Sequence, residues 1–173
     1  MAADQDPPVR PVARDHRLRR RRITRWRARP AGCDHRQVAA CVFCEIVAGR
    51  APAYRVTADE HAVAFLDLAP AAPGHTLVVP RGHARDVWEL PQDACAQVAR
   101  LVHGVSALLR VALAPDGLSI THATGEAAGQ DVFHFHTHVV PRWRGDDVRL
   151  MWKTRRASPQ ELQEVLERVT VAR

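Results

Sequence analysis

The sequence has no uninterrupted apolar run close to the ~18 residues that a membrane-spanning helix needs, although 46% of its residues are hydrophobic. It also lacks the apolar segment that follows the basic residues of a secretory signal, because residues 26–30, after the arginines, are themselves rich in Arg. We therefore expect a cytoplasmic protein with one folded domain, reduced cysteines and no membrane partner.

Three common enzyme motifs are also missing. The sequence contains no glycine-rich dinucleotide fingerprint, no P-loop and no Gly-x-Ser-x-Gly nucleophile elbow. These absences exclude the commonest nucleotide-binding and hydrolase classes, whose chemistry depends on those loops. Any catalytic group must therefore come from other clusters of residues.

Positive charge is concentrated at the amino terminus. Residues 1–40 hold 11 Arg and 4 Asp, whereas the balance over residues 41–173 is −1. Because residues 1–40 have no sustained apolar period, we predict that they form a disordered, Arg-rich extension. The arginine run at 19–22 could bind nucleic acid non-specifically through phosphates. A solvated tail, or translation from upstream of the true start, would explain it equally well.

Residues 41–145 carry the patterns of one α+β domain. We predict a helix over residues 92–112 from apolar residues spaced three and four apart, and a short helix after Cys41. Predicted strands lie at 54–57, 61–67, 75–80, 118–121 and 130–141. Because most of these strands are joined as hairpins, the sheet should be antiparallel. In the extension at 146–173, a capping box from Ser158 to Glu161 predicts an amphipathic helix.

Three histidines alternate with other residues inside the last predicted strand. In a strand, His134, His136 and His138 would share one face, with adjacent Cα atoms about 6.5 to 7 Å apart. One small anionic group could then contact two imidazoles. The spacing is typical of a reaction site or a metal site, and a half-exposed strand remains the simpler alternative.

A Cys-x-x-Cys motif at Cys41 and Cys44 opens the predicted domain. Such a pair is either a redox site or half of a zinc site. A redox motif of the thioredoxin type would follow a strand, whereas the Arg-rich segment precedes Cys41. Zinc would require two more ligands, and His83, in a turn after a predicted strand, is the best third candidate.

Five motifs occur in one order along the chain. They are Cys41-x-x-Cys44, Phe65-Leu66-Asp67, Pro73-Gly74-His75-Thr76-Leu77-Val78-Val79-Pro80, Ala128-Gly129-Gln130 and His134-Phe135-His136-Thr137-His138-Val139-Val140. In order and spacing they resemble the histidine triad (HIT) superfamily in its Hint-like bacterial form, over about residues 41–144. The resemblance implies a HIT-like α+β fold that forms a homodimer.

The same resemblance implies an enzyme. Members act as hydrolases or nucleotidyl transferases at the α-phosphate of a purine nucleotide conjugate, here a phosphoramidate or a dinucleoside polyphosphate. Two alternatives stay open. One is a zinc-stabilised nucleotide-binding or regulatory module with vestigial catalysis, and the other is a metalloenzyme that uses the triad as ligands.

Four catalytic positions are carried over by resemblance. His136 corresponds to the nucleophile that forms a covalent nucleotidyl-histidine, and His138 to the residue that contacts a phosphate oxygen. Gln130 corresponds to the residue at the bridging or leaving atom. Asp131 stands where the family frequently has Ser or Thr, whose hydroxyl passes a proton to the leaving group. A carboxylate there could exchange a proton with an amine but would repel phosphate, so the leaving group stays open.

Nucleotide and metal positions follow from the same comparison of motifs. Asp67 corresponds to the carboxylate that receives the ribose hydroxyls. The apolar slot for the base corresponds to Phe43, Ile46, Phe65 and Leu68, for which core packing is the simpler explanation. The ligands of zinc-bearing members correspond to Cys41, Cys44, His83 and His134. This Cys2His2 set implies structural zinc and no organic cofactor.

A second departure from the family lies just before Gly125. Members often have Asn there, whose amide helps to hold the nucleophile segment or the phosphate, whereas this chain has Ala123 and Thr124. His122 or Thr124 could take over that role.

Overall fold

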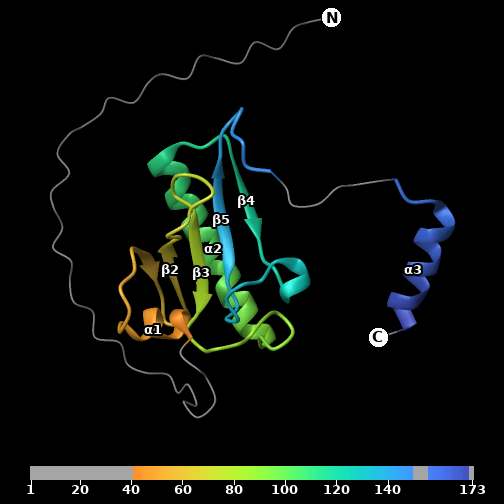
Figure 1. The fold of residues 1–173 in the computed structure, drawn as a ribbon, viewed down its shortest axis with the longest axis horizontal. Coiled ribbons are helices and arrows are strands. Elements are labelled where there is room, and N and C mark those ends of the chain that lie inside the picture. Colours follow the sequence, from red (N-terminus) through yellow and green to blue (C-terminus); the bar gives the residue numbers. More distant parts are fainter. Residues whose placement is uncertain (1–40, 150–155, 172–173) are drawn as a thin grey trace, which may run out of the picture.

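The computed structural model describes residues 41–149 and 156–171. The predicted disorder of residues 1–40, and part of the predicted extension at 146–173, lie outside the described residues. Five strands form one antiparallel sheet in the order β1-β2-β3-β5-β4 (Figure 1). The strands are β1 (Arg55–Ala58), β2 (Ala62–Leu66), β3 (Thr76–Pro80), β4 (Gly117–Thr121) and β5 (Thr137–Arg142). The α+β prediction is confirmed, while the homodimer stays a prediction.

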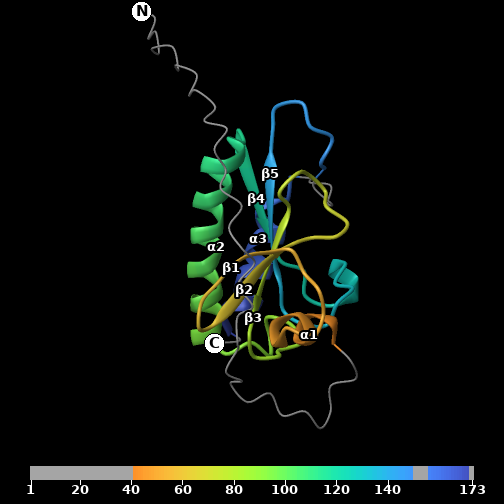
Figure 2. The same cartoon turned by 90° about the vertical axis from the view of Figure 1, so that its left-hand side faces the viewer.

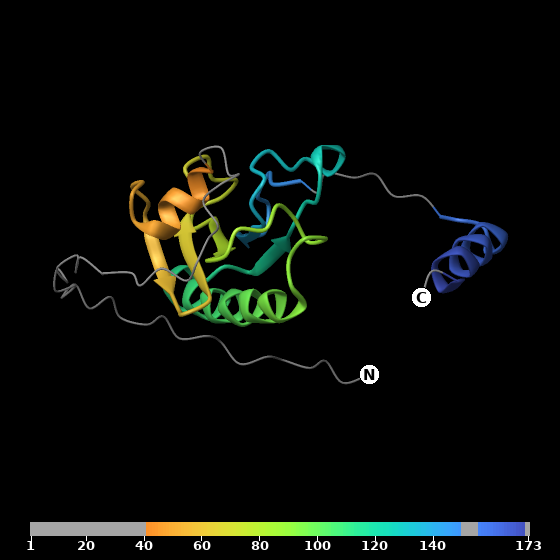
Figure 3. The ribbon, with the colours of Figure 1, turned by 90° about the horizontal axis from the view of Figure 1, so that it is seen from below.

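Helices cover the two faces of this sheet unequally. The long α2 (Gln92–Leu113) runs along one face, and the short α1 (Val42–Ala48) lies on the other (Figures 2 and 3). The remaining helices are the 3-10 turn η1 (Glu126–Ala128) and α3 (Pro159–Val171). His134 and His136 contact Phe43 of α1, so these two triad histidines lie on the α1 side of the sheet.

Helix α2 packs on the sheet through the stripe that its sequence period predicts. The buried residues of this stripe are Val98, Val102, Val105 and Leu109, which share a cluster with sheet residues that include Ala64, Val78 and Val139. By length and composition α2 could also cross a membrane, although polar residues interrupt its apolar ones. Its packed stripe is what a core helix of a globular domain requires.

The triad strand starts later than predicted. β5 begins at Thr137, so His134 and His136 lie in the segment before it rather than within a strand over 130–141. In the observed register Val78 pairs with Thr137. If the antiparallel ladder continued by two residues on each strand, Phe135 would lie opposite Pro80. Pro80 has no N–H to continue the ladder. Its carbonyl instead lies 3.1 Å from His134 Nε2, and Phe135 N donates to a loop carbonyl.

The capping box before α3 forms as its sequence indicates. Glu161 N donates to Ser158 Oγ at 3.2 Å, and Ser158 N donates to Glu161 Oε2 at 3.4 Å. These reciprocal bonds satisfy backbone donors that the first helical turn would leave unpaired. The apolar residues Leu162, Val165, Leu166 and Val169 of this helix are exposed.

Candidate active site

His136 has one ring nitrogen fixed by the backbone. Its Nδ1 lies 2.7 Å from the carbonyl oxygen of His134, and the ring is 2% exposed. A carbonyl can only accept, so Nδ1 carries the proton and Nε2 keeps its lone pair. Phe43 packs edge-on against the ring, with centroids 5.3 Å apart. The arrangement orients the ring so that Nε2 can act as a nucleophile.

His138 is oriented through a second histidine. Ala71 N donates to His75 Nδ1 at 3.1 Å, so a neutral His75 carries its proton on Nε2. That nitrogen lies 2.9 Å from His138 Nδ1 and donates to it, which leaves the proton of His138 on Nε2. His138 therefore offers a hydrogen-bond donor beside the lone pair of His136. Its ring centroid is 5.0 Å from that of His136.

Burial favours the neutral forms of His138 and His75. It lowers the pKa of His138 to about 4, with smaller contributions from the neighbouring His136 and His75. Burial also lowers the pKa of His75, against an opposing effect of Asp67, whose Oδ2 lies 3.6 Å from its Nδ1. Sequence patterns did not single out His75 as a site residue. The available signal was a polar side chain in an otherwise apolar strand.

We expect the free energy of unfolding to decrease as the pH is lowered from about 6.5 to about 4. The pKa of His138 is about 4 in the folded protein and near 6.5 in an unfolded chain, so the unfolded state binds more protons in this window. The stabilisation is complete above pH 6.5. Allowing for partial solvent screening, His138 should account for about 1–2 kcal/mol of the loss.

This expected pH dependence can be checked by thermal unfolding at pH 7 and pH 4.5. The proteins to compare are wild type, His138→Asn and His61→Ala, which changes an exposed histidine. The decrease in Tm should be smaller for His138→Asn than for the other two proteins. Equal decreases in all three would contradict the assignment.

His122 supports the backbone of the nucleophile. Its Nδ1 donates to the carbonyl oxygen of His136 at 2.7 Å, and its Nε2 accepts from the hydroxyl of Thr124 at 2.8 Å. The ring also packs on Phe135 at 4.2 Å between centroids. Thr124 thus holds the ring of His122, which in turn bonds the main chain of the triad segment.

Gln130 is buried and bonded to the backbone through its side-chain amide. It is 3% exposed, and its Oε1 accepts from Gly125 N at 2.8 Å. Its Nε2 donates to the carbonyls of Arg85 at 2.7 Å and Val132 at 3.1 Å. With both ends of the amide bonded to backbone, Gln130 holds the η1 loop against the triad segment. Its predicted contact with the bridging or leaving atom stays a prediction.

A cavity of about 350 Å³ opens beside His138. Its floor consists of alternate residues of β5, namely His138, Val140 and Arg142, because side chains two apart share a face. Asp131 and the η1 loop form part of its wall. This volume lies within the usual range for small-molecule sites, roughly 300–1,000 Å³.

The residues assigned to the base slot are only partly brought together. Phe43, Ile46 and Phe65 are buried in one cluster on the α1 face of the sheet. Leu68 is 80% exposed and is not a member of that cluster. Asp67 accepts from Ala69 N at 2.8 Å and lies near His75. The apolar cluster therefore contacts the ring of His136 through Phe43, whereas the carboxylate of Asp67 lies beside His75.

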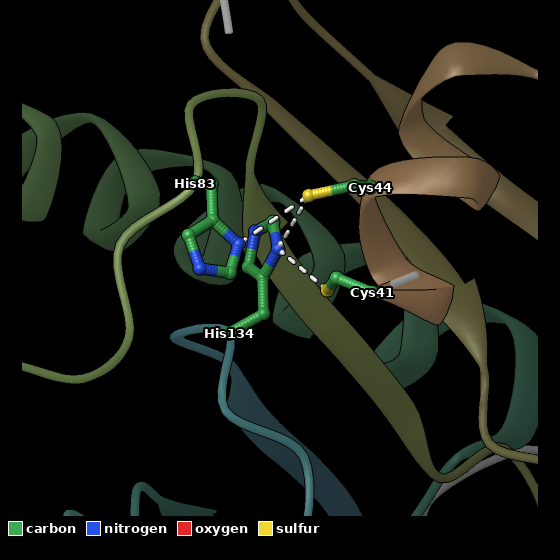
Figure 4. A group of neighbouring side chains, drawn as sticks. All are labelled: Cys41, Cys44, His83 and His134. Atoms are coloured by element: carbon green, nitrogen blue, oxygen red, sulfur yellow. Dashed lines mark hydrogen bonds between the residues drawn. The ribbon is translucent and has the colours of Figure 1, made fainter. Parts of the chain in front are cut away.

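The four residues assigned to zinc converge from three segments (Figure 4). Their ligand atoms all lie within 4.8 Å of one another. His134 Nδ1 is 3.5 Å from the sulfur atoms of both Cys41 and Cys44, and His83 Nδ1 is 3.3 Å from that of Cys44. Because His134 Nε2 donates to the Pro80 carbonyl, its Nδ1 lone pair faces the thiols. The donor set fits a tetrahedral Cys2His2 zinc site.

Comparisons with known proteins agree on one family. A family model described as the HIT domain matches residues 48–145. The crystal structure of a HIT family member from Bacillus subtilis is similar to this chain, with a TM-score of 0.71 and 37% identity, covering 76% of this chain and 96% of that one.

Two further relatives carry descriptions that bear on the site. Adenosine 5'-monophosphoramidase hnt1 of Schizosaccharomyces pombe is 32% identical over 132 residues, which are 76% of this chain and 96% of that protein. A Zn-bound histidine triad family protein from Mycobacterium smegmatis has a TM-score of 0.62 and 37% identity, covering 78% of this chain and 98% of that one.

Proposed function

Because this chain belongs to the HIT family of nucleotide hydrolases and nucleotide-binding proteins, we propose that it hydrolyses purine nucleotide conjugates at the α-phosphate. The proposed substrates are nucleoside phosphoramidates or dinucleoside polyphosphates. One observation carries the proposal. The backbone carbonyl of His134 fixes the proton of His136 on Nδ1 and leaves Nε2 as a lone-pair nucleophile.

In the first step, His136 Nε2 attacks the α-phosphorus and the bond from phosphorus to the leaving group breaks. The leaving group takes up a proton from water in the cavity. His136 gains positive charge, which its Nδ1–H bond to the His134 carbonyl stabilises. His138 donates from Nε2 to a phosphate oxygen on which negative charge is concentrated.

In the second step, water attacks phosphorus and the bond from phosphorus to Nε2 breaks. The nucleotide leaves, the proton of the attacking water returns to solvent, and His136 is neutral again. The net reaction joins one water to the conjugate and yields a nucleotide and a free leaving group. Two displacements replace one difficult attack by water.

Zinc in this proposal has a structural role. Cys41, Cys44, His83 and His134 would hold the ion and join α1 to the triad segment, and their donor types support that assignment. His136 and His138 keep their lone pair and proton for the substrate.

Hydrolysis of a fluorogenic adenosine 5'-phosphoramidate by the full chain tests the proposal. We expect turnover that depends on His136 and that continues in a brief chelator treatment that leaves the protein folded. Nucleotide binding without any turnover would instead identify a binding module with vestigial catalysis. Turnover that chelator abolishes reversibly in folded protein would identify a metalloenzyme.

A further inference from the structure

The cavity beside His138 carries opposite charges at its two ends. Asp131 lines the cavity at the His138 end, close enough that its carboxylate partly opposes the lowering of the His138 pKa that burial causes. Arg149 lines the cavity with Val148 and Arg142. Arg142 follows His138 by four residues in β5, so the Cα atoms of these two floor residues are about 13 Å apart, and the side chains of the cavity wall extend into the space between them.

At the end of the cavity away from His138, Arg149 is the cation that can bind a ligand. The guanidinium of Arg142 is occupied, because it pairs with Asp146 at 2.6 Å and donates to Ser119 Oγ at 3.0 Å and to the Val148 carbonyl. Arg149 is exposed and forms no ion pair with another residue of the described ranges. Its charge is therefore available at the cavity wall.

At the His138 end of the cavity, the carboxylate of Asp131 favours a hydrogen-bond donor or a cation over an anion. Its Oδ1 accepts from the adjacent Val132 N at 2.8 Å, which holds the side chain at the cavity wall while leaving its second oxygen for a ligand. A phosphate leaving group would bring negative charge next to this carboxylate. The N–H of a phosphoramidate would instead donate to it, and the amine formed on cleavage would be attracted as a cation.

We propose that the leaving group of this enzyme is an amine that carries an anionic group, such as a carboxylate, at its far end. The nitrogen bonded to phosphorus faces Asp131, and the carboxylate reaches Arg149. This inference rests on the proposed function and narrows its substrates from two classes to acidic-amine phosphoramidates.

Three adenosine 5'-phosphoramidates of equal chain length test the inference, with pentylamine, 5-aminopentanoate or 1,5-diaminopentane as leaving amine. For the wild-type full chain, kcat/KM should be about fivefold higher for 5-aminopentanoate than for pentylamine, as one partly screened ion pair allows. The diaminopentane conjugate should be the poorest of the three.

Arg149→Gln should reduce the preference for 5-aminopentanoate over pentylamine to about one. Arg144→Gln is the matched control, because Arg144 is exposed nearby but does not line the cavity. It should retain the preference. Equal hydrolysis of all three conjugates by wild type would overturn this inference alone, as would an unchanged preference in Arg149→Gln. Absence of hydrolysis of every conjugate would overturn the proposed function as well.

Discussion

Replacing His136 by Ala is expected to lower kcat for a nucleoside phosphoramidate by about four to six orders of magnitude, as for nucleophiles in other covalent mechanisms. The variant loses the lone pair that attacks phosphorus, and water must then act directly. The buried ring also contacts Phe43, so Tm should be measured beside activity. A protein that remains folded and inactive assigns the loss to chemistry.

A direct test of the same step is the mass of the protein during turnover. Wild-type protein quenched within the first turnovers should carry one added nucleotidyl group, and a peptide containing His136 should hold it. His61→Ala, which removes an exposed histidine in the turn before β2, should form the adduct normally. Turnover of His136→Ala within tenfold of wild type would contradict the mechanism.

Local patterns in the sequence predicted most of the fold. The apolar stripe of α2, the hairpin of β1 and β2, and the capping box of α3 each depend on residues close together in the chain. The start of β5 was missed, because it depends on Pro80, which lies in a different strand and cannot donate to the ladder. Pairing partners of this kind are not visible in the alternation of one segment.

In the candidate site, too, motifs predicted some residues, whereas the contacts of other residues depend on packing in the folded chain. Resemblance named four candidate metal ligands, whose ligand atoms the fold brings within 4.8 Å of one another. It did not reveal that His75 sets the proton position on His138, since a polar residue just before a buried strand has no distinctive spacing. It also placed Leu68 in the base slot, although that side chain is largely exposed. Such details follow from side-chain directions that only the folded chain defines.

Loss of the Cys2His2 set should affect stability more than catalysis. We expect Cys44→Ala to lower the free energy of unfolding by about 3 kcal/mol, and Tm by ~10 °C, because a structural metal contributes folding energy that the unfolded chain cannot recover. Cys44 on α1 also contacts the imidazoles of His83 and His134, so its replacement removes a hydrogen-bond partner from two rings in a part-buried site. At a temperature where the variant is folded, kcat should fall less than tenfold, because neither His136 nor His138 belongs to the set.

Cys95→Ala is the matched control, since this exposed cysteine on α2 lies outside the cluster. Wild type and Cys95→Ala should each contain about one zinc per chain and share one Tm, whereas Cys44→Ala should lose both the zinc and the stability. Chelation of wild type should reproduce the lower Tm, and added zinc should restore it. A Cys44→Ala protein as stable as Cys95→Ala, with wild type free of zinc, would mean that the four side chains hold α1 by packing and hydrogen bonds alone.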